Sequence, residues 1–155
     1  MNKIIARCIF IVSIGVWIVL SISEPWVLSD ENKFLNDFVN HELLNVLGVI
    51  MAITLASAAN LHLEFNKIED AANKTFLTTT RSSVKQSAFS MIVLFVIAVT
   101  VVVIKSHFSA SEVATSFING SALLIILFNI LVLIDLTLLV FSIPPIHKMI
   151  SKDDD

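Results

Sequence analysis

Asp135 is the residue with the clearest potential for chemistry, because it is the one carboxylate in the apolar stretch LLIILFNILVLIDLTLLVF. A carboxylate at the centre of a membrane-crossing helix costs about 2.5–3.5 kcal/mol on insertion scales, so it should face protein or water. Asp135 could therefore serve in one of three ways: as a member of a structural polar network, in a water-lined path or ion site, or in a proton-coupled transport site.

Other polar side chains at comparable depth are candidate partners of Asp135. Arg7 lies near the start of the first apolar run, and Asn60 and His62 lie near the end of the second. Asn129 shares the stretch with Asp135, but its helical phase differs by about 120°, so it should contact something else. These residues form the predicted intramembrane polar set, which would be either a network or the lining of a pore.

No pattern for catalysis, a cofactor or a metal is visible. His41, His62, His107 and His147 are scattered and form no HxxH or HxxxH pair, so no metal site is predicted. Phosphate-binding loops, nucleophile elbows and zinc-protease motifs do not occur. Cys8 is the single cysteine, which excludes an internal disulfide and a CxxC pair. We therefore expect neither an enzyme nor a cofactor, and a net charge of −3 gives no reason to expect a nucleic-acid partner.

The composition is that of an integral membrane protein. Of the 155 residues, 56% are hydrophobic and 15% are charged, whereas soluble domains carry about 25% charged residues. Apolar runs that approach or exceed the roughly 20 residues needed to cross a bilayer occupy residues 4–22, 43–63, 87–104 and 121–143. The sequence predicts an all-α fold, an integral membrane four-helix bundle that forms one domain over residues 1–155.

The first run and the segment after it leave two alternatives open. Pro25 should end the first helix, but residues 21–23 before Glu24 also resemble a signal-peptidase site, which would remove this run. Residues 29–42 are predicted to form a helix capped by Ser29. That helix would either lie on the membrane surface or continue into the second run.

Residues 64–86, between the second and third runs, are predicted to form a polar helical-hairpin stalk. Apolar residues from Leu61 to Ala72 recur at helical spacing, with charged residues between them. Ser83 and Gln86 match a capping box, which predicts that the returning helix begins near Val84. The candidate docking surface for a soluble partner consists of Lys67, Ile68, Glu69 and Lys74.

A ridge of small residues runs along the second apolar run. Gly48, Ala52, Ala56 and Ala59 recur at helical spacing, which places them on one face. Small residues let membrane helices approach closely, since lipid supplies little hydrophobic force between them. The ridge should therefore touch another helix, either within one subunit or across a subunit interface.

The basic residues indicate the orientation in the membrane. All but two of the ten Lys and Arg residues fall on the side that holds the stalk and both termini, and the exceptions are Lys33 and Lys105. By the positive-inside rule, the termini and the stalk are cytoplasmic. We expect a multi-pass protein of a bacterial inner membrane.

Two functions fit these features better than a third. A homo-oligomeric sensor or anchor would use the stalk to couple the lipid bilayer to a soluble cytoplasmic partner. A homo-oligomeric pore, for example a tetramer, would conduct ions along its symmetry axis. A small transporter fits less well, because small multidrug exporters are shorter and carry an acid in their first span.

In length, number of spans, cytoplasmic termini and polar hairpin, the chain resembles small four-span bacterial membrane proteins of phage exclusion and defence. The proteins that it resembles are phage-exclusion proteins of the RexB type and the membrane subunit of the Kiwa defence system. The resemblance is one of topology and includes no shared motif, so it assigns no functional residue. It implies either membrane depolarisation or membrane sensing coupled to a soluble effector.

Overall fold

The computed structural model describes residues 3–72, 77–108 and 111–141, and the described part is entirely helical outside its turns. The helices are α1 (Lys3–Ser23), α2 (Pro25–Leu28), α3 (Lys33–Phe38), α4 (His41–Ala72), α5 (Thr78–Lys105) and α6 (Glu112–Phe141). The predicted all-α class is therefore confirmed.

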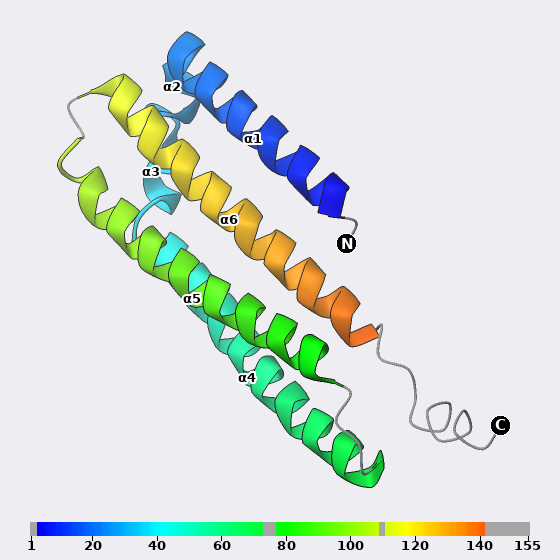
Figure 1. The fold of residues 1–155 in the computed structure, drawn as a ribbon. Coiled ribbons are helices and arrows are strands. Elements are labelled where there is room, and N and C mark those ends of the chain that lie inside the picture. Colours follow the sequence, from blue (N-terminus) through cyan, green and yellow to red (C-terminus); the bar gives the residue numbers. More distant parts are fainter. Residues whose placement is uncertain (1–2, 73–76, 109–110, 142–155) are drawn as a thin grey trace.

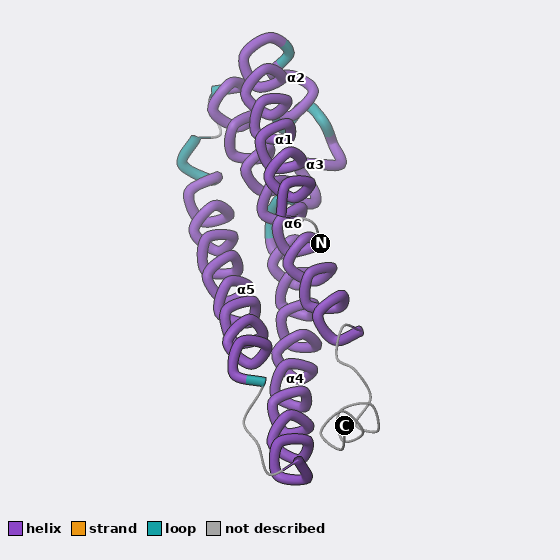
Figure 2. Tube along the Cα trace, turned by 45° about the vertical axis from the view of Figure 1, so that its right-hand side comes forward, coloured by secondary structure: helices purple, strands orange, loops and turns teal. Residues whose placement is uncertain are grey.

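The four longest helices lie side by side in the order α4, α5, α6, α1 (Figure 1). The short helices α2 and α3 gather at one end of the molecule, near the connection from α5 to α6, which we call the loop end. At the other end, α4 and α5 continue past the start of α1 (Figures 1 and 2). We call this the hairpin end and define it by residues 64–72 and 77–86.

The long helices are built to cross a membrane. By length and composition, α4, α5 and α6 can each span a bilayer, and the bent pair of α1 with α2–α3 adds a fourth candidate. Large apolar side chains on their outer surfaces are exposed, including Ile53, Phe89, Val96 and Ile130. Such surfaces need lipid around them, so the chain is a multi-pass helical membrane protein.

The first three predicted apolar runs lie within α1, α4 and α5, and the fourth lies within α6 as far as Phe141, beyond which residues 142–143 are outside the described part. The predicted break occurs at Pro25. This proline is the first residue of α2, and the chain bends by 116° between the two members of the pair. A proline at the first helical position has no N–H to lose and starts a new helix readily. The fourth run is continuous with the residues before it, because α6 passes through Gly120 without a break.

The segment after the bend differs from the single helix predicted for residues 29–42. Ser29 is the residue at which α2 ends, and its Oγ accepts a hydrogen bond from the N–H of Glu31 at 3.3 Å. α3 is only six residues long. Asn40 then caps α4, because its Oδ1 accepts from the N–H of Glu42 at 2.9 Å. Local side-chain bonds thus divide the segment into turns.

Asp30 connects three elements at the loop end. Its Oδ1 lies 2.9 Å from Nζ of Lys105, at the last turn of α5, and accepts from Nδ2 of Asn119 in α6 at 2.9 Å. The same amide nitrogen donates to the carbonyl of Leu28 at 2.9 Å. The Asn119 side chain is fully buried. These contacts hold the loop end together without a disulfide.

Trp17 fixes the contact between α1 and α6. Its indole packs edge-on against Phe117, with ring centroids 5.5 Å apart, and it covers Gly120 so closely that any Cβ there would overlap it. Ser21 and Ser116, each one helical turn from these residues, are fully buried. Small residues thus allow the two helices to approach closely.

Replacing Gly120 should therefore loosen α1 from α6. For Gly120→Ala we expect a destabilisation of about 1–3 kcal/mol, because the added methyl overfills a packed contact. The measurement is the melting temperature of the purified protein in detergent.

Gly15→Ala is the matched control, since no atom lies within 4 Å of the Cβ position at Gly15. Alanine favours helix over glycine by up to about 1 kcal/mol, so this variant should melt at the same temperature or slightly higher. Equal melting temperatures for the two variants would contradict the packing role of Gly120.

Candidate functional site at the hairpin end

A buried carboxylate connects α4 to α5 at the hairpin end. The Glu69 side chain is 9% exposed. Its Oε1 accepts from the backbone N–H of Leu77 at 2.8 Å, and its Oε2 accepts from Nη2 of Arg81 at 2.8 Å. Arg81 also donates to Oδ1 of Asn66 at 2.8 Å. We call these four residues the hairpin clamp.

The clamp corrects the predicted start of the returning helix. α5 begins at Thr78 and not near Val84, and Ser83 lies inside it, with its Oγ donating to the carbonyl of Thr79 at 3.1 Å. Leu77 precedes the helix, and its apolar side chain cannot cap it. The carboxylate of Glu69, at the end of α4, binds the Leu77 N–H in its place, so the capping group comes from the opposite helix.

An apolar cluster lies beside the clamp. Phe65, Leu77 and Val84 are buried together with Ala58 and Leu136, so α4, α5 and α6 all contribute. The part of the predicted stripe from Leu61 to Ile68 therefore faces inward, as amphipathic spacing requires, whereas the side chain of Ala72 is outside the described ones. Leu61 and Ile68 pack against this cluster.

The structure divides the predicted docking surface. Lys67 is exposed and pairs with Glu64 at 2.6 Å, one turn earlier in α4. Ile68 packs against the apolar cluster and Glu69 is buried in the clamp, so neither is free to contact a partner. Lys74 lies outside the described residues. The charged surface that remains on α4 at the hairpin end consists, among the described side chains, of Glu64, Lys67 and Asp70.

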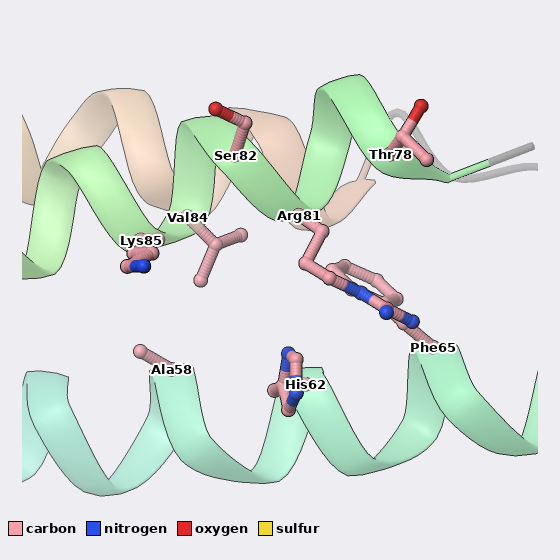
Figure 3. Close-up of a pocket in the computed structure, with 8 residues that line it drawn as sticks. All are labelled: Ala58, His62, Phe65, Thr78, Arg81, Ser82, Val84 and Lys85. Atoms are coloured by element: carbon pink, nitrogen blue, oxygen red, sulfur yellow. The ribbon is translucent and has the colours of Figure 1, made fainter.

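A pocket opens between α4 and α5 next to the clamp (Figure 3). Its volume is about 500 Å³. The picture shows Arg81 reaching from α5 toward Phe65 of α4, with Val84, His62 and Lys85 further along. We call this space the hairpin pocket, and its lining consists of Ala58, His62, Phe65, Thr78, Arg81, Ser82, Val84 and Lys85.

A second groove, of about 440 Å³, lies between α4 and α6, and we call it the α4–α6 groove. It is unusual for a membrane-crossing surface because polar side chains alternate with apolar ones along it. The hydroxyls of Thr54, Ser57 and Thr137 bind carbonyls of their own helices at 2.7–2.9 Å. Its polar lining consists of Thr54, Ser57, Asn60, Glu64 and Thr137.

The structure places the predicted intramembrane polar set on different surfaces. Asp135 and Arg7 are exposed, whereas Asn129 is buried and donates to the carbonyl of Ile125 at 2.9 Å. Asn60 lines the α4–α6 groove and His62 lines the hairpin pocket. Contact between Arg7 and Asp135 stays a prediction.

The small-residue ridge is also divided. Gly48 faces α5, where a Cβ would lie 3.7 Å from the ring of Phe95. Ala52, Ala56 and Ala59 are exposed on the single chain. Packing within the subunit thus accounts for Gly48 only, and the subunit interface stays the prediction for the three alanines.

Sequence reasoning missed the basic residues of the hairpin clamp and the hairpin pocket, and the polar contacts at the loop end. Arg81 and Lys85 served only to indicate the orientation of the chain, although their spacing of one helical turn could have suggested a shared basic face. Asp30 and Asn119 lie far apart in the sequence, and no local pattern relates them. Among residues 3–72, 77–108 and 111–141, no three His, Cys, Asp or Glu side chains are grouped to hold a metal ion.

Comparisons with known protein families, with curated proteins and with solved structures found no match for this chain. The functional assignment therefore depends on the geometry of the two ends and of the grooves between the helices.

The clamp should hold the first turn of α5 in place. For Glu69→Ala we expect amide hydrogen exchange from Leu77 to Arg81 to accelerate by about tenfold or more, because a hydrogen bond to a charged group contributes about 1.5–3 kcal/mol. The measurement is hydrogen–deuterium exchange with mass spectrometry in detergent.

Glu64→Ala provides the control, since it removes a carboxylate from the same helix. The Glu64–Lys67 pair is exposed, and such pairs contribute only about 0–1 kcal/mol. Exchange in α5 should stay as in the wild type. Similar acceleration in both variants would show that loss of any charge in this part of α4, and not loss of the clamp, opens the hairpin.

Proposed function

We propose that this chain is a homo-oligomeric sensor or anchor of a bacterial inner membrane that couples to a soluble cytoplasmic partner. It would cross the membrane four times, with α1 as the first crossing. The observation that carries the proposal is the hairpin end, where a clamp of partly buried polar groups holds a charged extension of the membrane helices. α4 continues roughly 13 Å beyond residue 63 at 1.5 Å per residue, which places its charged turns outside the apolar core.

The distribution of basic residues supports a cytoplasmic hairpin end. Arg7 in the second turn of α1, and Lys67, Arg81 and Lys85 at the hairpin end, lie toward the same end of the molecule. Lys105 lies at the loop end and is neutralised by Asp30. Because basic residues accumulate on the cytoplasmic side of bacterial membrane proteins, the hairpin end and α1's start face the cytosol.

The clamp gives a physical basis for coupling. A flexible loop would absorb any change in the angle between α4 and α5, whereas a hairpin tied by Glu69 and Arg81 transmits it to the charged surface. That surface consists of Glu64, Lys67 and Asp70. A stimulus acts only if it favours one of two helix arrangements, so membrane perturbation would have to change the packing of α4 on α5.

The exposed alanines support association of several copies. Three small side chains are exposed on α4, at Ala52, Ala56 and Ala59, and small residues allow a helix from a second copy to approach closely. The topological resemblance to phage-exclusion and defence proteins fits an assembly of this kind, in which a membrane subunit reports to a soluble effector.

Photo-crosslinking at the charged surface tests the coupling. A photoreactive amino acid at position 67 should form an adduct with one soluble protein in cells, and the double variant Glu64→Lys, Asp70→Lys should lose it, since the acidic charges on both sides of that position are reversed. Adducts are identified by mass spectrometry after purification of the membrane protein.

A photoreactive residue at position 93 is the control, because Val93 is exposed on the apolar part of α5. It should yield only lipid adducts or adducts between copies of this chain. The coupling role is contradicted if position 67 gives the same products as position 93, or if the charge-reversed protein keeps its partner while its melting temperature is unchanged.

The α4–α6 groove favours a second function, an ion-conducting pore. Polar side chains on membrane-crossing helices usually face water or protein, and Ser57, Asn60 and Thr137 are exposed in the single chain. In an oligomer, such grooves from several copies could surround a hydrated path. Asp135 lies two residues from Thr137 and so on nearly the opposite face of α6, outside this groove.

Recordings from liposomes test the pore. If the groove conducts, Asn60→Leu should lower the wild-type current at least tenfold, because it removes a hydrated side chain from the groove. Ile97→Leu, a change on the exposed apolar surface of α5, should leave it intact. Absence of current through membranes that contain the wild-type protein at high concentration would exclude the pore.

A further inference from the structure

The hairpin pocket combines basic groups from two helices. Arg81 and Lys85 are one helical turn apart on α5, and His62 enters from α4 (Figure 3). Residues with this spacing have Cβ atoms about 5–6 Å apart, so their side chains can bind the same group. The hydroxyl residues Thr78 and Ser82 also line the space.

The apolar part of the lining lies toward the membrane-crossing portion of the helices. Ala58 and Val84 are found at that end, beside Lys85, whereas Thr78 and Arg81 are found toward the hairpin turn (Figure 3). Phe65, the remaining apolar residue of the lining, is buried beside Arg81 at the hairpin-turn end (Figure 3). A molecule that fills this pocket must therefore carry both a group that accepts hydrogen bonds and an apolar portion.

The charges at the pocket favour an anion. Glu69 neutralises Arg81 on one side through Nη2, but Nε of Arg81 is buried and has no hydrogen-bond partner among the described residues. A buried donor of this kind is normally satisfied, so an acceptor is expected to bind it. Lys85 is exposed, and no carboxylate of the described residues pairs with it.

We propose that the hairpin pocket binds the headgroup of an anionic phospholipid from the leaflet at the hairpin end. The phosphate lies between Arg81 and Lys85, and accepts hydrogen bonds from Arg81 Nε and from the hydroxyl of Ser82. The glycerol and the start of an acyl chain follow Ala58 and Val84 into the bilayer. This inference requires only that the helices cross a membrane, so it does not depend on a soluble partner or on a pore.

The apolar wall separates a lipid from a free phosphate. Inorganic phosphate would satisfy Arg81 and Lys85 but would make no contact with the apolar part of the lining at Ala58 and Val84. A zwitterionic lipid would bring an ammonium group near Lys85, which repels it. Basic pockets between membrane helices are known to select anionic headgroups for these reasons.

Native mass spectrometry of the full-length protein in detergent tests the proposal. The probes are phosphatidylglycerol and phosphatidylcholine with identical acyl chains. Wild-type protein should retain phosphatidylglycerol preferentially, and Lys85→Gln should weaken its retention by about fivefold, the effect of removing one basic residue near a membrane surface. Lys85 is exposed, so this variant should fold.

Lys67→Gln is the matched control, because it makes the same change of charge at the hairpin end but outside the pocket. It should bind phosphatidylglycerol as the wild type does, whereas Ser82→Ala should weaken binding in the pocket. Equal retention of both lipids, or equal losses in Lys85→Gln and Lys67→Gln, would overturn the proposal. If inorganic phosphate competes with the lipid at equal concentration, the site binds a free anion and the lipid assignment is wrong.

Discussion

In the membrane-crossing parts of this chain, several polar side chains are satisfied by carbonyls of their own helices. Thr54, Thr100, Asn129 and Thr137 each donate to the carbonyl four residues earlier, at 2.7–3.0 Å. Lipid offers no competing hydrogen bonds, so such local pairing is the least costly arrangement. As a consequence these groups are not available to join one span to another, and the spans are held by packing and by contacts at their ends.

The two ends of the molecule are held by the same kind of contact. At the loop end Asp30 lies between Lys105 and Asn119, and at the hairpin end Glu69 lies between Arg81 and the start of α5. In each case a carboxylate from one element neutralises a cation of α5 and also accepts an N–H from its surroundings. Removing one member of a partly buried pair leaves an uncompensated charge, which makes such contacts specific for one arrangement of helices.

The sequence was sufficient for the spans and insufficient for the contacts between them. Apolar length predicted the long helices, and Pro25 predicted the bend, because both are local properties. The start of α5 was misplaced because its cap, Glu69, belongs to the preceding helix. Likewise, hydropathy identified Asp135 as costly to insert but could not tell that this side chain is exposed whereas Asn129 is buried, since that depends on which helices are neighbours.

Arg81 belongs to both the hairpin clamp and the hairpin pocket, and this relates the two proposals. Its guanidinium has five N–H donors in a fixed plane, and those bound to Glu69 and Asn66 come from Nη2 alone. A headgroup on Nε would therefore complete the guanidinium without displacing Glu69. The bound lipid would strengthen the clamp, so loss of anionic lipid at this leaflet would loosen the same hairpin that presents Lys67 and Asp70 to the cytosol.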